Sequence, residues 1–154
     1  MSEAATTTHP PHSPLAKPPR RRLLRSVGAV LAGLLAYFAL SGGTDASLYA
    51  TGVYPPMFHP MADHLWALAL TYRVVFAVVG GFVAARLAPA GPLRHVMVLG
   101  GIETVLGVLT VLANWNKGPE FGPHWFAMCV TITALPCTAL GGVLGAKRIA
   151  RVNQ

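Results

Sequence analysis

Phe121–Ala146 (FGPHWFAMCVTITALPCTALGGVLGA) is a run of 26 residues that contains no Asp, Glu, Lys or Arg. An α-helix rises about 1.5 Å per residue, so about 20 residues are enough to cross the roughly 30 Å hydrocarbon layer of a bilayer. A soluble protein of this size has no use for so long an uncharged helix. The run therefore predicts a membrane-spanning helix.

Three further apolar stretches precede this run, and each is long enough to span the bilayer. Pro and Gly residues lie between the stretches, as is typical of loops that connect helices. We expect an all-α protein, a four-helix transmembrane bundle that forms one domain over residues 23–148. The four spans are expected at about 23–44, 64–86, 94–114 and 124–147.

The composition fits an integral membrane protein. Hydrophobic residues make up 53% of the chain and charged residues 11%, whereas soluble domains usually carry about 25% charged residues. Residues 1–22 differ from the rest because they are rich in Pro, Thr and His and end in a basic cluster. We predict a disordered, Pro-rich cytoplasmic tail there, and we expect its basic cluster to bind anionic lipid rather than nucleic acid.

The Lys and Arg residues are distributed unevenly between the two ends of the predicted helices. If the N-terminus is inside, ten of them fall on the inner side, Lys117 alone falls on the outer side, and Arg73 lies within a span. The ten are Lys17, Arg20, Arg21, Arg22, Arg25, Arg86, Arg94, Lys147, Arg148 and Arg151. Because cytoplasmic loops carry an excess of Lys and Arg, both termini are predicted to be cytoplasmic.

Small residues recur at a spacing of four in the second and fourth predicted helices. Gly141 and Gly145 form a G-x-x-x-G motif with Gly142 beside it, and Gly80 and Gly81 begin similar pairs with alanines. Such strips let helix backbones approach closely. They predict tight packing near the inner end of the bundle, which leaves the outer half wider. A dimer interface is the alternative use of the same strips.

Arg73 is the most informative single residue because it lies near the middle of the second predicted span. An unpaired Arg at that depth costs at least about 2.5–3.5 kcal/mol, so it should face the interior and pair with a carboxylate. At about 1.5 Å per residue, Arg73 lies ~20 Å from the inner end, Glu103 ~14 Å and Asp45 ~30 Å. Helical side chains lean toward the N-terminus of their own helix, which brings Arg73 closer to Asp45. We predict Asp45 as its direct partner, with Glu103 nearby through water or a polar side chain.

Two functions remain open for these three side chains. The Arg73 pair can simply fix the arrangement of the helices, as in a non-enzymatic accessory or scaffold component, which is our first interpretation. Alternatively, Arg73, Asp45 and Glu103 form the polar site of a small transporter or permeation protein. Without a cation partner Glu103 is expected to be neutral, which suits either a proton carrier or a silent core acid.

Motifs of enzymes and metal sites are absent from the sequence. It contains no G-x-S-x-G, no H-E-x-x-H and no phosphate-binding loop, so we expect no enzymatic activity. His59 and Asp63 have a spacing that suits a metal ion, but no second pair completes such a site. We therefore expect neither a metal nor another cofactor. The expected partners are the lipid bilayer and either a second copy of the chain or another membrane protein.

Four segments resemble a set of small bacterial four-span membrane proteins of uncharacterised activity. The segments are GGTDASLYATGVYPP (42–56), LTYRVVFAVVGGFVAARLAP (70–89), RHVMVLGG (94–101) and WNKGPEFGPHWF (115–126). The resemblance covers about Val27 to Gly145. It implies a multi-pass protein of the bacterial inner membrane, and it brings no activity, cofactor or catalytic residue with it.

Overall fold

The structure, a computed structural model, describes residues 20–152, and most of them are helical. Each of the four long helices is long and apolar enough to cross a membrane, and no strand occurs within the described range. These findings confirm the predicted all-α four-helix bundle. The elements in chain order are α1 (Arg20–Ala50), α2 (Asp63–Leu87), α3 (Pro92–Asn114), the short 3-10 helix η1 (Pro119–Phe121) and α4 (His124–Val152).

α1 is longer than the first predicted span at both ends. It includes 20–22, which were expected in the tail; the rest of that predicted tail lies outside the described residues. It also continues beyond residue 44, where the predicted span ended, because no proline follows until Pro55. The Ser47 hydroxyl donates a second hydrogen bond to the Gly43 carbonyl oxygen, at 2.8 Å. Asp45, expected just beyond the span, consequently lies within the helix.

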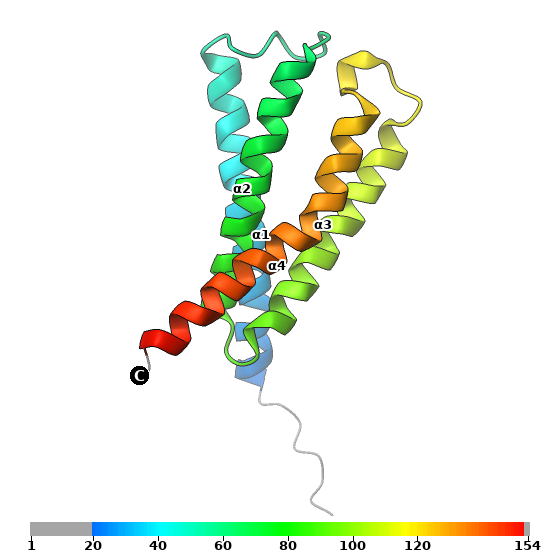
Figure 1. Cartoon of the computed structure of the whole chain (residues 1–154). Coiled ribbons are helices and arrows are strands. Elements are labelled where there is room, and N and C mark those ends of the chain that lie inside the picture. The colour runs from blue at the N-terminus through cyan, green and yellow to red at the C-terminus, as the bar shows by residue number, and fades with distance from the viewer. Residues whose placement is uncertain (1–19, 153–154) are drawn as a thin grey trace, which may run out of the picture.

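The four helices form two antiparallel hairpins, α1–α2 and α3–α4 (Figure 1). The hairpins converge at the end of the bundle where α1 begins and α4 ends, which we call the termini end. They diverge at the opposite end, the loop end, which holds the α1–α2 and α3–α4 connections. α4 crosses the bundle diagonally, and its contact with α2 is the most extensive between any two helices. The bundle is therefore wider at its loop end.

Glycines make the close contact between the hairpins at the termini end. Gly81 lies against the carbonyl of Thr138 and Gly141 against the carbonyl of Val78, so a side chain at either position would collide with backbone. The other predicted packing glycines are also buried: Gly80 lies on Gly33, Gly142 on Val96 and Gly145 on Ala85. The small-residue strips thus pack within the chain, which leaves them unavailable for the alternative, a dimer.

Candidate functional site

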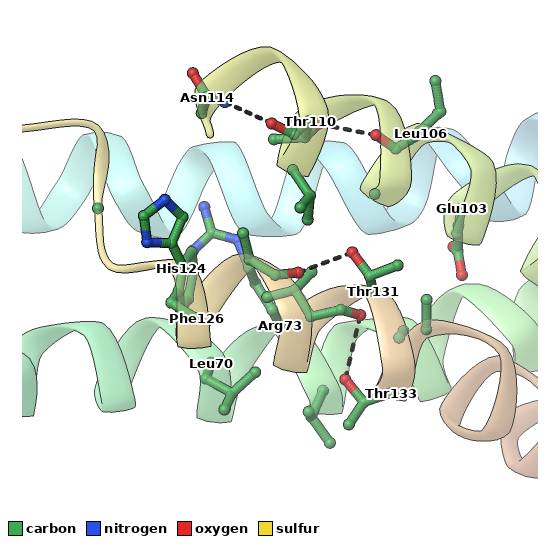
Figure 2. Close-up of a pocket in the computed structure, with 18 of the residues that line it drawn as sticks. Leu70, Arg73, Glu103, Leu106, Thr110, Asn114, His124, Phe126, Thr131 and Thr133 are labelled. Atoms are coloured by element: carbon green, nitrogen blue, oxygen red, sulfur yellow. Dashed lines mark hydrogen bonds between the residues drawn. The ribbon is translucent and has the colours of Figure 1, made fainter. Parts of the chain in front are cut away.

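A cavity of about 260 Å³ lies between the hairpins, on the side of the bundle toward the loop end (Figure 2). All four helices contribute to its walls, which are mainly apolar and aromatic. It reaches the α3–α4 connection at His124, and Glu103 lies at its opposite, inner end (Figure 2). Arg73 lies between these two residues, whereas Asp45 is not among the lining side chains. The cavity therefore contains two of the three predicted site residues.

Arg73 on α2 forms an ion pair with Asp45 on α1. The Arg73 Nη2 atom donates to Asp45 Oδ2 at 2.7 Å. Among the side chains that the structure describes, this is the one salt bridge. The two side chains are 23% and 27% exposed, so the pair is partly buried. The structure confirms Asp45 as the direct partner that the depth argument predicted. The positive charge of Arg73 is thus compensated within the chain.

Two tyrosines extend this pair toward the α1–α2 connection. Tyr72 donates its hydroxyl to the second oxygen of Asp45 and accepts a hydrogen bond from Arg73 Nη1 at 3.2 Å. The Tyr54 hydroxyl lies 3.2 Å from that of Tyr72 and donates to it, because the proton of Tyr72 is already engaged by Asp45. Both carboxylate oxygens of Asp45 are therefore occupied. Neither tyrosine was predicted from the sequence, although Tyr72 is adjacent to Arg73.

The guanidinium group of Arg73 also contacts aromatic rings. Its central carbon lies 5.3 Å from the ring centre of Tyr72 and 5.5 Å from that of Phe126 on α4. A cation over an aromatic face is attracted by the ring quadrupole. Arg73 therefore links α2 to α1 through a charge and to α4 through a ring, and both interactions fix the position of its side chain beside the cavity.

Glu103 on α3 is separate from this ion pair. Its side chain is 7% exposed, and its Oε2 accepts a hydrogen bond from Thr138 on α4 at 2.5 Å. Its Oε1 has no hydrogen-bond partner, and no described Lys or Arg lies within salt-bridge distance. No described side chain links Glu103 to Arg73 by hydrogen bonds, because the diagonal course of α4 places Thr138 against the carboxyl instead, and the predicted link through water stays a prediction. Glu103 and Arg73 meet only as lining groups of one cavity.

Aromatic contacts between the two hairpins border the outer part of the cavity. The rings of Trp66 and Phe126 lie 4.8 Å apart, and those of Phe58 and Phe121 lie 6.1 Å apart. The Trp66 ring also lies against Gly122, whose φ of 97° is rarely adopted by residues with a side chain. At the loop end, therefore, side chains rather than backbone join the hairpins.

His124 begins α4 at the edge of the cavity. Its Nε2 lies 2.9 Å from the carbonyl oxygen of Trp115, so Nε2 carries the proton and donates it. Its ring packs against the Trp115 ring with 4.5 Å between the centres. Within residues 20–152 no three His, Cys, Asp or Glu side chains are grouped as a metal site would require. His124 is thus held as part of the loop structure.

Comparison of the chain with protein-family models, with curated proteins and with solved structures finds no match. The chemistry of the cavity must therefore be judged from its own residues. The cavity combines a charge-compensated Arg73, an acid at Glu103 without a cation partner, and mainly apolar walls with aromatic rings. Pockets of this composition suit small molecules that carry one polar group on an apolar body.

Proposed function

We propose that this integral membrane protein admits a small molecule from its loop end into the cavity between its hairpins, as a transporter or permeation protein does. The cavity is the observation that carries this proposal, because it extends from the α3–α4 connection to Glu103. A scaffold whose Arg73 pair is purely structural would favour a bundle that is packed throughout its length. No enzymatic step and no cofactor form part of the proposal.

The scaffold interpretation explains one half of the candidate site. Asp45 compensates Arg73, and Tyr72 occupies the remaining Asp45 oxygen, so this pair is satisfied without any ligand. We assign the pair to the architecture of the bundle and the cavity with Glu103 to ligand binding. This division supports the transporter alternative over the accessory role.

We also propose that the termini end faces the cytoplasm of a bacterium and that the bundle lies in its inner membrane. The exposed cations Arg86, Arg94, Lys147 and Arg148 lie at the termini end, whereas the loop end carries Lys117. Arg22 and Arg94 border a groove between α1 and the start of α3 there, and both suit the anionic headgroups of the inner leaflet. The same excess of cations supports the orientation.

Access of water to the cavity can be tested with single cysteines. In a background where Cys129 and Cys137 are replaced by serine, Val111→Cys would place a thiol in the cavity wall and Leu112→Cys one on the outer surface. The protein is reconstituted in nanodiscs and treated with a water-soluble, membrane-impermeant thiosulfonate. The cysteine at 111 should react at least tenfold faster than that at 112, which is 68% exposed in the structure but faces lipid in a bilayer.

A second pair of neighbouring positions provides an independent test of water access. Thr131 on α4 lines the cavity, and the adjacent Ile132 is 71% exposed on the outer surface. Thr131→Cys should react at least tenfold faster than Ile132→Cys. If neither cavity position reacts faster than its lipid-facing neighbour, water does not enter between the hairpins and the proposed function is wrong.

A further inference from the structure

The balance of charges in the cavity is incomplete at Glu103. The positive charge of Arg73 is already compensated by Asp45, whose carboxylate lies 2.7 Å away. The Glu103 side chain is 7% exposed and has one protein hydrogen bond, from Thr138, while its Oε1 has none. The buried carboxyl therefore lacks a cation, and its Oε1 atom lacks a hydrogen-bond donor. A ligand with a positively charged N–H group supplies both.

We propose that the cavity binds a small organic ammonium ion and that Glu103 Oε1 accepts a hydrogen bond from its N–H group. This ligand class rests on the function proposed above, since the ligand must reach Glu103 through the cavity. An anion is a poorer match, because it would meet the Glu103 carboxyl while the Arg73 guanidinium already donates to Asp45 and Tyr72. A charge-assisted hydrogen bond to a carboxylate is about twice as strong as a neutral one, which gives the site its selectivity.

The walls of the cavity suit the apolar part of such a ligand. Tyr37 and Phe38 on α1 and Phe126 on α4 supply aromatic rings, and ring faces attract ammonium ions. Leu70 and Leu106 contribute aliphatic surface. The volume of about 260 Å³ lies just below the roughly 300–1,000 Å³ of pockets for drug-sized molecules. The ligand is therefore small, on the scale of an amine with a single ring.

Binding exchanges a proton for the ligand. In the empty cavity the proton sits on the Glu103 carboxyl, because a buried carboxylate without a cation is costly. When the ammonium ion binds, this proton leaves through the cavity to water and the carboxylate pairs with the ligand, so the charge of the site is unchanged. The ionisable groups around Glu103 are Tyr37 on α1, Arg73 on α2 and Cys137 on α4. Arg73 alone among them is charged at neutral pH, and Asp45 compensates it.

Calorimetric titration of the full chain in nanodiscs with benzylamine tests the proposal. We expect saturable binding, release of about one proton per ligand, and an affinity that rises up to tenfold per pH unit while Glu103 is protonated in the empty site. Benzyl alcohol, which is neutral, and benzoate, which is anionic, have similar size and should bind at least tenfold more weakly. These three ligands need no altered protein.

Two carboxylate-to-amide variants locate the site. Glu103→Gln keeps the shape of the side chain and a partner for Thr138 but cannot carry the charge, so benzylamine affinity should fall at least tenfold and lose its pH dependence. Asp63→Asn is the matched control, because Asp63 is an exposed acid at the start of α2, outside the cavity. Its affinity should equal that of the unaltered protein.

The outcomes distinguish the proposed ligand class from the proposed function on which it rests. The ammonium proposal is wrong if benzoate or benzyl alcohol binds as tightly as benzylamine, or if Glu103→Gln binds benzylamine as tightly as the unaltered protein. If none of the three ligands binds while the cysteines at 111 and 131 react with the thiosulfonate, the ligand class is wrong and the open cavity stands. If those cysteines are also unreactive, both proposals are wrong.

Discussion

The Nη2 atom of Arg73 lies 2.7 Å from Oδ2 of Asp45, which joins α2 to α1 inside the candidate membrane spans. Tyr72 completes the arrangement by donating to the second oxygen of Asp45 and accepting from Arg73. Every charge in this group has a partner in the chain. The pair therefore stabilises the first hairpin. In contrast, the Oε1 atom of Glu103 on α3 has no hydrogen-bond partner in the chain.

Breaking the pair from one side should destabilise the protein. Arg73→Met leaves Asp45 without its cation, and we expect a loss of roughly 2 kcal/mol, below the values for fully buried pairs because this one is partly exposed. Replacing both residues, Arg73→Met with Asp45→Leu, should cost clearly less than the sum of the two single changes. Unfolding in mixed detergent, followed by tryptophan fluorescence, measures all three. Additive losses would show that the two side chains do not stabilise each other.

The hydrogen bond between Thr138 and Glu103 can be separated from the ligand site in the same way. Thr138→Val removes the donor to Oε2 and leaves both carboxyl oxygens without a partner, which should cost about 1–3 kcal/mol. Adding Glu103→Leu should restore part of that loss, because no polar group then remains unpaired. Thr71→Val on the exposed side of α2 is the control and should change stability little. An equal loss at 71 and 138 would contradict a specific role for the buried bond.

Glycine substitutions test the contact between the hairpins. Gly141→Ala would place a methyl group against the carbonyl of Val78, and relieving that contact should cost about 1–3 kcal/mol. Gly101→Ala in α3 is a matched control with open space around the added carbon, so it should be neutral or stabilising by up to about 1 kcal/mol. Thermal unfolding in detergent distinguishes them. Equal stability of the two variants would argue against close packing at Gly141.

The proposed orientation predicts that cysteines at two exposed positions react with an impermeant reagent from opposite sides of the membrane. In the background without native cysteines, Asn116→Cys in the α3–α4 connection should react with an impermeant reagent in intact bacterial cells whose outer membrane has been made permeable. Ala90→Cys in the α2–α3 connection should react only after the inner membrane is also opened. The reverse pattern would place the termini end outside.

Depth along the helices was predictable from the sequence, whereas rotation about the helix axes was not. The pairing of Arg73 with Asp45 follows from the rise per residue and the direction of each helix, which do not depend on packing. The partner of Glu103 depends on which face α4 turns toward α3, and that face is set by the contact of Gly141 with Val78. Sequence spacing alone could not place Thr138 there.

The same limit explains the missed tyrosines and the misjudged helix end. Tyr72 is adjacent to Arg73, and neighbouring residues on a helix point in different directions, so spacing gave no reason to expect the hydroxyl and the guanidinium to meet. The apolar run ended at about residue 44, but α1 continues to Ala50 because no proline interrupts it before Pro55. The apolar runs still predicted the number of helices, and the small-residue strips predicted the wider loop end.

The glycine contact at the termini end is a natural pivot for the two hairpins. Among the described glycines, backbone approaches between the hairpins occur there, while the far ends touch through the rings of Trp66, Phe126, Phe58 and Phe121. Each helical turn away from such a pivot adds about 5.4 Å of lever arm. A slight rocking at the pivot is therefore magnified at the mouth, where exchanging one ring contact for another requires no backbone hydrogen bond to break.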